Sequence, residues 1–168
     1  MPLLIPSVDL HSGDVYCFSS KASRRALSDD IIYINNINIG KAVRASCSYP
    51  VIFSPCKYLN LELADGGIRE NIPWRETKYM GADKVISVVF EEEQNKDCCS
   101  NIIDVVSSSM DILIRELSNC ELKGADYLLK IKTEKISLLD MNKIDELFNL
   151  GYKTAKMHIS EIKSMLQI

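Results

Sequence analysis

The sequence predicts an α/β fold in which helices cover both faces of a sheet. Short β-branched and apolar runs alternate with segments of helical periodicity after residue 80. The run Asp83 to Phe90 (DKVISVVF) is almost continuously apolar, which is typical of a strand buried on both faces. The last segment, from about Met141 to Leu166, repeats apolar residues every three or four positions, which indicates a helix packed against a core.

Length and composition indicate one soluble globular domain. The chain has 168 residues, of which 46% are hydrophobic and 26% charged, so we expect residues 1–168 to form a single domain or part of one. The net charge of −3 and the lack of a basic stripe argue against nucleic-acid binding. No apolar run approaches the roughly 20 residues of a membrane span, and the N-terminus has no signal-peptide pattern. We therefore expect a cytoplasmic protein.

The cysteines do not predict a metal site. Six are present, at positions 17, 47, 56, 98, 99 and 120, without C-x-x-C spacing, and the chain has only two histidines. Adjacent Cys98 and Cys99 make a poor pair for a disulfide, so free thiols in a reducing compartment are expected. No calcium loop of the EF-hand type is present, and no cofactor is expected.

The first elements are a hairpin and a short helix. Leu3 to Leu10 and Val15 to Ser19 are predicted strands joined by a turn at 11–14. Residues 20–37 look irregular and exposed. Asn38 is a predicted cap for a short helix that ends near Ser46.

The middle of the chain contains a rigid bend, a strand and a second short helix. Pro50 and Pro55 bracket the apolar bend. A strand is expected from Tyr58 to Ala64, ending at Asp65-Gly66-Gly67. Pro73 suits the first position of a helix that runs to about Tyr79, with Gly81 as its stop.

In the last part of the chain, an acidic loop is expected from Glu91 to Asp97. Ser100 is the predicted cap of a long helix, and a short strand is expected from Tyr127 to Ile131.

Asp65 is the first candidate for chemistry, and its pattern supports two interpretations. Gly66 and Gly67 permit positive φ and close backbone approach, so the chain can turn sharply and leave the Asp65 carboxylate at a strand end. Open α/β sheets usually carry their sites at such ends. The structural interpretation is an Asp-Gly turn in which the carboxylate caps its own backbone.

Several further motifs follow in a fixed order. They are Arg44-Ala45-Ser46, Pro50, Phe53, Pro55, Asp65-Gly66-Gly67, Asn71-Ile72-Pro73 and Gly81-Ala82-Asp83, preceded by VDLHSG at residues 8–13. Together they resemble the patatin-like phospholipases, a family of serine acyl hydrolases, over residues 1 to about 93. The resemblance implies a three-layer α/β/α sandwich, of which this chain carries only part.

By this resemblance Asp65 is the general base of a Ser–Asp dyad that hydrolyses lipid acyl esters. No histidine and no cofactor take part in that chemistry. The resemblance also implies residues that shape the site, which are Gly66, Gly67, Arg44, Ser46, Pro50 and Asn71. We expect 11–13, 44–55 and 65–73 to converge on one rim of the fold.

The family's nucleophile is missing from this sequence. It sits in a G-x-S-x-G turn, and none of the seven glycines here flanks a serine at that spacing. The family's glycine-rich oxyanion loop is also missing. Ser46, Ser48 and the run 107–109 are poor substitutes. We therefore expect an incomplete fold, without its N-terminal strands and nucleophile elbow, that is inactive alone.

Whether the chain is an enzyme is left open by these observations. One hypothesis is the C-terminal portion of a patatin-like hydrolase, acting on a lipid or ester substrate once the missing part is supplied. The alternative is a naturally truncated, non-catalytic interaction module. Such a module would pair with itself or with a partner through an exposed sheet edge.

Overall fold

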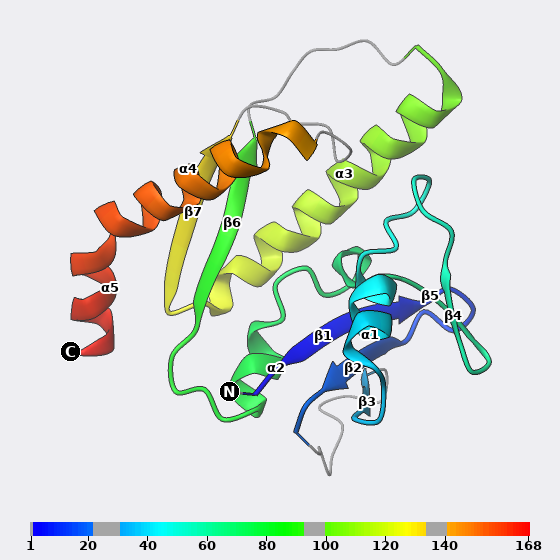
Figure 1. The fold of residues 1–168 in the computed structure, drawn as a ribbon, viewed down its shortest axis with the longest axis horizontal. Coiled ribbons are helices and arrows are strands. Elements are labelled where there is room, and N and C mark those ends of the chain that lie inside the picture. The colour runs from blue at the N-terminus through cyan, green and yellow to red at the C-terminus, as the bar shows by residue number, and fades with distance from the viewer. Residues whose placement is uncertain (1, 22–30, 93–99, 134–140) are drawn as a thin grey trace. The chain divides into compact units, whose positions relative to one another are not determined.

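The protein is a mixed α/β structure (Figure 1). The computed structural model describes residues 2–21, 31–92, 100–133 and 141–168. The chain divides into two compact units: the larger unit holds Met1–Asp83 and Cys99–Gly124, and the smaller unit holds Lys84–Cys98 and Ala125–Ile168. The mixed α/β composition confirms the predicted fold class.

A five-stranded sheet in the order β3-β2-β1-β5-β4 forms the centre of the larger unit. Its strands are β1 (Leu4–Asp9), β2 (Val15–Ser19), β3 (Ile31–Ile34), β4 (Cys56–Tyr58) and β5 (Leu61–Asp65). The pair β1–β2 is antiparallel, which confirms the predicted hairpin, and β1 also pairs antiparallel with β5. The pair β2–β3 is parallel.

Two local predictions within this sheet are wrong. Residues 31–34 form β3 instead of irregular chain, because their β-branched side chains suit a sheet. The predicted single strand from Tyr58 to Ala64 is the second half of a hairpin, β4–β5. The hairpin turns at Leu59, whose positive φ of 52° ends the first strand.

Helices lie on both faces of this sheet. The buried side chains of β2 point alternately to one face and to the other, so each face has its own core. Phe18 packs with Ala42, Ala45 and Leu63, so that α1 (Ile39–Ser46) covers one face. Asn38 caps α1 by accepting a hydrogen bond from the Gly40 amide at 2.9 Å, as predicted.

The opposite face carries Val8, Val15, Cys17 and Ile31. Ile68 of the 3₁₀ helix Gly66–Ile68 packs there, and Tyr79 of α2 (Trp74–Tyr79) stacks at 5.7 Å from Tyr33. The predicted stop at Gly81 has a φ of 100°.

The long helix α3 (Ile102–Glu121) begins one residue later than predicted. Asn101 is its cap and accepts the Asp104 amide at 2.9 Å, whereas Ser100 donates to the Asp104 carboxylate. No residue of α3 is buried. Its exposed apolar side chains are Ile102, Ile103, Val105, Val106, Ile112 and Leu113.

The smaller unit pairs β6 (Ile86–Glu92) in parallel with β7 (Tyr127–Thr133). Val88 and Phe90 of β6 are 54% and 65% exposed, whereas Ser87 on the other face is buried. The prediction that this strand is buried on both faces is therefore wrong: in the described structure the side chains on one of its faces are exposed.

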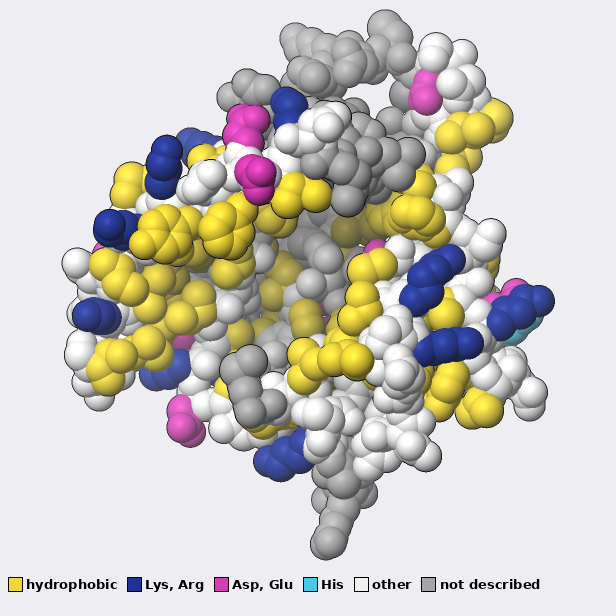
Figure 2. Space-filling view, viewed as in Figure 1, with side chains coloured by type: hydrophobic (Ala, Val, Ile, Leu, Met, Phe, Trp, Pro, Cys, Tyr) yellow, Lys and Arg dark blue, Asp and Glu magenta, His cyan; other side chains and the backbone are white. Residues whose placement is uncertain are grey.

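Two helices, α4 (Ile144–Met157) and α5 (Ile159–Leu166), follow β7 in the smaller unit. The predicted continuous helix breaks at His158. On α4, Gly151 lies against Ile131 of β7. Figure 2 shows hydrophobic side chains gathered over α4 and α5. The exposed ones are Ile144, Phe148, Tyr152, Met157 and Ile159.

Cys17, Cys47, Cys56 and Cys120 are free thiols, as predicted. Cys98 and Cys99, and the expected acidic loop beyond Glu92, lie outside the described residues. Among the described helices none is both long and apolar enough to cross a membrane.

Candidate catalytic site around Asp65

Asp65 is the last residue of β5, at the point where the sheet gives way to a 3₁₀ turn. Across the sheet it lies opposite Ser7 of β1. Its amide donates to the Ser48 carbonyl at 3.0 Å, which joins the end of β5 to the chain that follows α1. Asp65 is thus held on one side by pairing of β5 with β1 and on the other by a backbone hydrogen bond to Ser48.

The Asp65 side chain caps the turn and also faces partly outward. Its Oδ1 accepts the Gly67 amide at 2.8 Å, as the structural interpretation predicted. Among the described residues, no donor reaches its Oδ2. Partial burial raises the pKa of the Asp65 carboxyl, and the Gly67 hydrogen bond offsets part of that rise. One oxygen is held by the backbone and the other is available to take a proton.

Space requires glycine at position 66, and it is tight but less restrictive at Gly67. A Cβ on Gly66 would lie 2.5 Å from the Pro6 carbonyl oxygen, and one on Gly67 would lie 3.0 Å from Asn71 Oδ1. Positive φ among the described glycines occurs at Gly13 and Gly81 instead. The close-approach part of the prediction is therefore right, and the positive-φ part is wrong for this pair.

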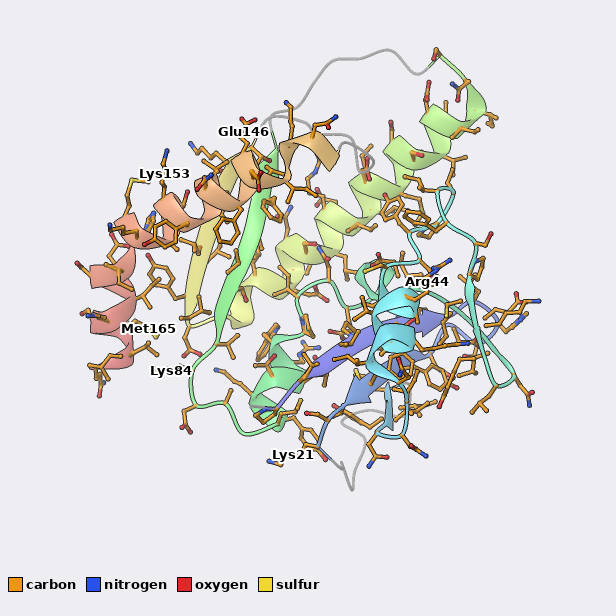
Figure 3. All side chains as sticks on the ribbon, viewed as in Figure 1. Lys21, Arg44, Lys84, Glu146, Lys153 and Met165 are labelled. Atoms are coloured by element: carbon orange, nitrogen blue, oxygen red, sulfur yellow. The ribbon has the colours of Figure 1, made fainter. Side chains whose placement is uncertain are left out.

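Arg44 and Ser48 hold the segment that contacts Asp65. Ser48 is buried, and its hydroxyl donates to the Arg44 carbonyl at 2.8 Å while accepting from the Arg44 guanidinium. The guanidinium also donates to the Ser54 carbonyl at 3.0 Å and lies over the Phe53 ring at 5.9 Å. Figure 3 labels Arg44 on α1. The sequence prediction missed Ser48, although its i,i+4 spacing from Arg44 on a helix end was visible.

Ser46 and Pro50 lie on the same segment, at the end of α1 and just before the bend. Both are half-buried. The residue after Pro50, Val51, has a φ of 73°, which is unusual for a β-branched side chain.

Asn71 fastens the other side of the turn to α3. Its Nδ2 donates to Ser118 Oγ at 2.6 Å, and the Ile72 amide donates to Glu121 Oε2 at 2.8 Å. Burial raises the pKa of the Glu121 carboxyl, partly against these hydrogen bonds. Neither Ser118 nor Glu121 was predicted, because nothing local in the sequence marks a partner almost 50 residues away.

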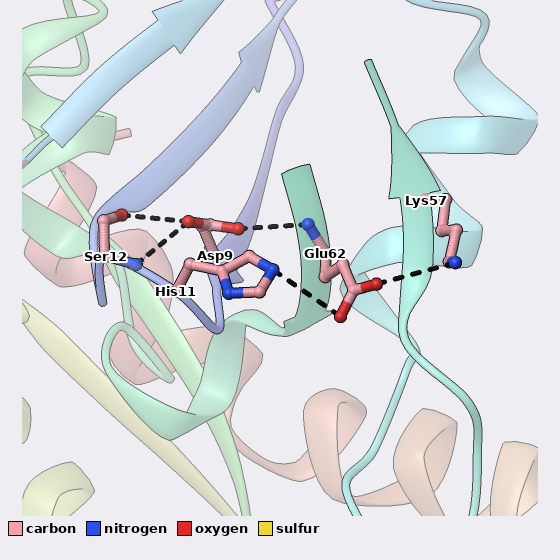
Figure 4. A network of polar contacts seen from close by, with 5 residues as sticks. All are labelled: Asp9, His11, Ser12, Lys57 and Glu62. Atoms are coloured by element: carbon pink, nitrogen blue, oxygen red, sulfur yellow. Dashed lines mark hydrogen bonds and ion pairs between the residues drawn. The ribbon is translucent and has the colours of Figure 1, made fainter. Parts of the chain in front are cut away.

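The turn that follows β1 lies away from Asp65. Asp9 accepts hydrogen bonds from Ser12 and from the Glu62 amide, and His11 lies 3.6 Å from the Glu62 carboxylate (Figure 4). Glu62 is near the start of β5 and Asp65 is at its end. The expected convergence of 11–13 with 65–73 is seen in one contact, from Arg69 to the Gly13 carbonyl at 2.7 Å, whereas His11 contacts Glu62.

Other candidate groups have structural roles. Ser109 of α3 donates to the Val105 carbonyl of its own helix. His158 contacts Tyr127 and Glu161 in the smaller unit. Within the described ranges, no three His, Cys, Asp or Glu side chains are grouped so that they could hold a metal ion.

The strand-end aspartate, its two close-packed glycines and the bend tied to it by Ser48 all lie within one continuous stretch of chain. Residues 15–78 match the family model of the patatin-like phospholipases. This patatin-like segment, residues 15–78, extends from β2 to α2 and includes Asp65, Gly66 and Gly67 together with Arg44, Ser46, Ser48, Pro50 and Asn71. The match covers less than half of the chain. It supports the prediction that the motifs made, namely a resemblance to the patatin-like phospholipases, which are a family of lipid acyl hydrolases.

Proposed function

We propose that this chain is the C-terminal part of a patatin-like serine acyl hydrolase that cleaves lipid acyl esters with a Ser–Asp dyad. Asp65 is the general base. The observation that supports this proposal best is the Asp65 carboxylate itself, held through Oδ1 by the Gly67 amide at a strand end inside the patatin-like segment. Among the described residues, none donates a hydrogen bond to its second oxygen.

The chemistry needs one proton acceptor beside a serine hydroxyl. Asp65 takes the hydroxyl proton while the serine oxygen attacks the ester carbonyl, and it gives that proton to the alcohol that leaves as the acyl-enzyme forms. Water then attacks the acyl carbonyl while Asp65 accepts a proton from it. The bond from the serine oxygen to the acyl carbon breaks, the serine takes the proton back from Asp65, and the free acid is released. Partial burial favours this role, since a carboxylate with a raised pKa is a stronger base.

The nucleophile comes from outside these 168 residues, because no serine here stands in a G-x-S-x-G turn. The chain is then one partial domain that is inactive alone, and its complete form acts in the cytoplasm on a lipid or simple ester. Arg44, Ser46, Pro50 and Asn71 shape the wall of the site around Asp65.

A fluorophosphonate probe tests whether a nucleophile is present. Such probes form a covalent bond with activated serines, so the 168-residue chain is expected to remain unlabelled and to show no esterase turnover. A serine hydrolase treated in parallel controls for the reactivity of the probe. Stoichiometric labelling of any serine in the chain would contradict the proposal.

The alternative is a non-catalytic module that associates through its sheet. Two observations favour it: β3 and β4 are the edge strands of the described sheet, and α3 exposes a row of apolar side chains. Light scattering after size exclusion tests this function. A homodimer would support it, and a monomer at high protein concentration, with no partner found, would count against it.

A further inference from the structure

Residues 31–61 carry cations and no acids. Although the chain has 23 Asp and Glu residues and 20 Lys and Arg residues, the charged residues of this stretch are Lys41, Arg44 and Lys57 alone. The stretch forms β3, α1 and β4 of the larger unit, together with the bend between α1 and β4. Lys41 and Arg44 are exposed on α1. This part of an acidic protein is therefore locally basic, and an anionic partner is attracted to it.

Helix α1 turns its larger apolar side chains outward. Its buried residues are Ala42 and Ala45, whereas Ile39 and Val43 are 61% and 45% exposed. Since Ile39 and Val43 are four residues apart, they form one apolar row on the outer side of the helix, next to Arg44. A surface helix usually places its larger apolar side chains in the core. The outer side of α1 is instead apolar and basic, and hydrophobic and basic side chains lie together there (Figure 2).

The bend after α1 adds three exposed apolar side chains, which are those of Val51, Ile52 and Phe53. The Phe53 amide closes the bend by donating to the Tyr49 carbonyl at 2.9 Å. The Arg44 guanidinium lies over the Phe53 ring at 5.9 Å, so the bend borders the exposed side of α1. Val51 keeps its positive φ in this bend, and backbone conformations of that kind concentrate at functional sites. The apolar bend is thus held in place by its own contacts.

Charge distinguishes this surface from the other exposed apolar side chains. Helix α3 exposes apolar residues as well, but it carries one cation and four acids, which are Asp104, Asp111, Glu116 and Glu121. Acids and lysines are equal in number on α4 and on α5. Glu62 and Asp111 reach residues 31–61 from outside: Glu62 lies 3.6 Å from Lys57, and Asp111 accepts the Tyr49 hydroxyl at 2.6 Å. The cations of the stretch outnumber them.

We propose that the outer side of α1 and the bend at residues 50–55 form a docking surface for a membrane rich in anionic phospholipids. The apolar side chains enter the boundary between headgroups and acyl chains, and the charges of Lys41 and Arg44 meet the lipid phosphates. The hydrogen bond from the Asp65 amide to the Ser48 carbonyl connects this surface to the Asp65 turn. The proposal goes beyond the proposed function, because docking needs neither a nucleophile nor turnover.

Co-sedimentation of the 168-residue chain with lipid vesicles tests the proposal. One set of vesicles contains phosphatidylcholine alone, and the other contains equal parts of phosphatidylcholine and phosphatidylglycerol. We expect tighter binding to the anionic vesicles, and weaker binding as the salt concentration rises. Lys41→Gln should lower the affinity for anionic vesicles about fivefold. Phe53→Ser should lower it roughly tenfold, because an apolar ring no longer enters the lipid.

Two control variants make the same kinds of change elsewhere. Lys153→Gln on α4 and Leu113→Ser on α3 alter exposed residues and should keep wild-type affinity. The proposal is overturned if the wild-type chain does not bind anionic vesicles, or if the controls lose as much affinity as Lys41→Gln and Phe53→Ser. Light scattering checks for self-association. If Phe53→Ser turns a dimer into a monomer and leaves vesicle binding unchanged, the surface pairs two copies of the chain and the proposal is wrong.

A fluorescence variant that keeps an aromatic ring in the bend gives a second readout, and it decides if Phe53→Ser fails to fold. Trp74 on α2 is the one tryptophan of the chain, and α2 lies on the face of the sheet opposite α1. Phe53→Trp combined with Trp74→Phe moves this probe to the bend. Brominated lipids in the anionic vesicles should quench the new tryptophan more strongly than Trp74 of the wild type, and equal quenching would overturn the proposal.

Discussion

Asp65 combines a structural and a chemical position in one side chain. Its Oδ1 closes the turn through the Gly67 amide, and its half-buried carboxyl has a raised pKa. In a form of the protein that contains the nucleophile, Asp65→Asn should lower kcat by about 10²–10⁴-fold, because an amide cannot accept the serine proton. The amide oxygen still caps the turn, so thermal stability should change little. Asp83→Asn, an exposed control, should retain full activity, and wild-type turnover in Asp65→Asn would exclude Asp65 as the base.

Gly66 is the residue whose side-chain space is most restricted in the Asp65 turn. Gly66→Ala would bring a Cβ to 2.5 Å from the Pro6 carbonyl oxygen, and backbone atoms of Pro6 cannot move aside as a flexible side chain can. We expect a loss of about 1–3 kcal/mol in the free energy of unfolding, measured with urea. Gly151→Ala is the matched control, since its Cβ would meet Ile131 at an ordinary 3.7 Å in a helix, where alanine is favoured. Equal stability of the two variants would contradict the close packing at Gly66.

Residues with local signals were the ones that could be predicted from sequence. The Asn38 cap, the stop at Gly81 and the strand-end position of Asp65 depend on neighbours within a few residues. Ser118, Glu121 and the burial of Glu76 depend on which distant segments meet, and a single sequence does not specify those contacts.

The turn between β1 and β2 depends on one carboxylate. Burial alone would raise the pKa of Asp9, but hydrogen bonds from Ser12 and from the Glu62 amide outweigh it and lower the pKa below 3.8. Its stabilisation is therefore present above pH 3.8 and is lost as the pH falls through the lower folded value. Asp9→Asn should cost about 1–3 kcal/mol at neutral pH and lose this acid dependence. Urea unfolding at several pH values measures the loss of stability and its acid dependence, with Asp83→Asn as the control. If the stability of Asp9→Asn falls with decreasing pH as that of the wild type does, Asp9 does not have this role.

Helix α5 is joined to β7 by Tyr127, whose hydroxyl contacts both His158 and Glu161. Tyr127→Phe removes these bonds and should lower amide hydrogen-exchange protection in α5 while β6 and β7 keep theirs. Tyr152→Phe, on the exposed side of α4, makes the same chemical change without touching these bonds and should leave α5 unaffected. Unchanged protection in Tyr127→Phe would show that other contacts hold α5.

At the scale of the elements, the periodicity of apolar residues predicted which helices and strands exist better than where they begin and end. β2 matches the expected strand from Val15 to Ser19, a short run that directly follows the turn at 11–14. The C-terminal helix breaks at His158, although its apolar stripe continues, since the stripe reports burial and not backbone continuity. The β4–β5 hairpin was missed because its turn has no glycine.

For the whole molecule, the linked motifs proved more informative than composition. Composition indicated only a globular protein, whereas the ordered motifs pointed to the family whose model matches residues 15–78. The division into two compact units was not visible in the sequence, because no linker-like segment marks it. The β6 strand was expected to be buried on both faces, and the exposure of Val88 and Phe90 agrees with the proposal that the domain is partial.

The central claim is that Asp65 serves a serine that lies outside these 168 residues. The most direct test is to treat the native protein from its source with a fluorophosphonate probe and to map the labelled residue by mass spectrometry. We expect one labelled serine, in a G-x-S-x-G turn N-terminal to the present residue 1, and no label within the chain. A label on any serine of the 168 residues, or a native protein of 18.9 kDa that takes no label, would contradict the claim.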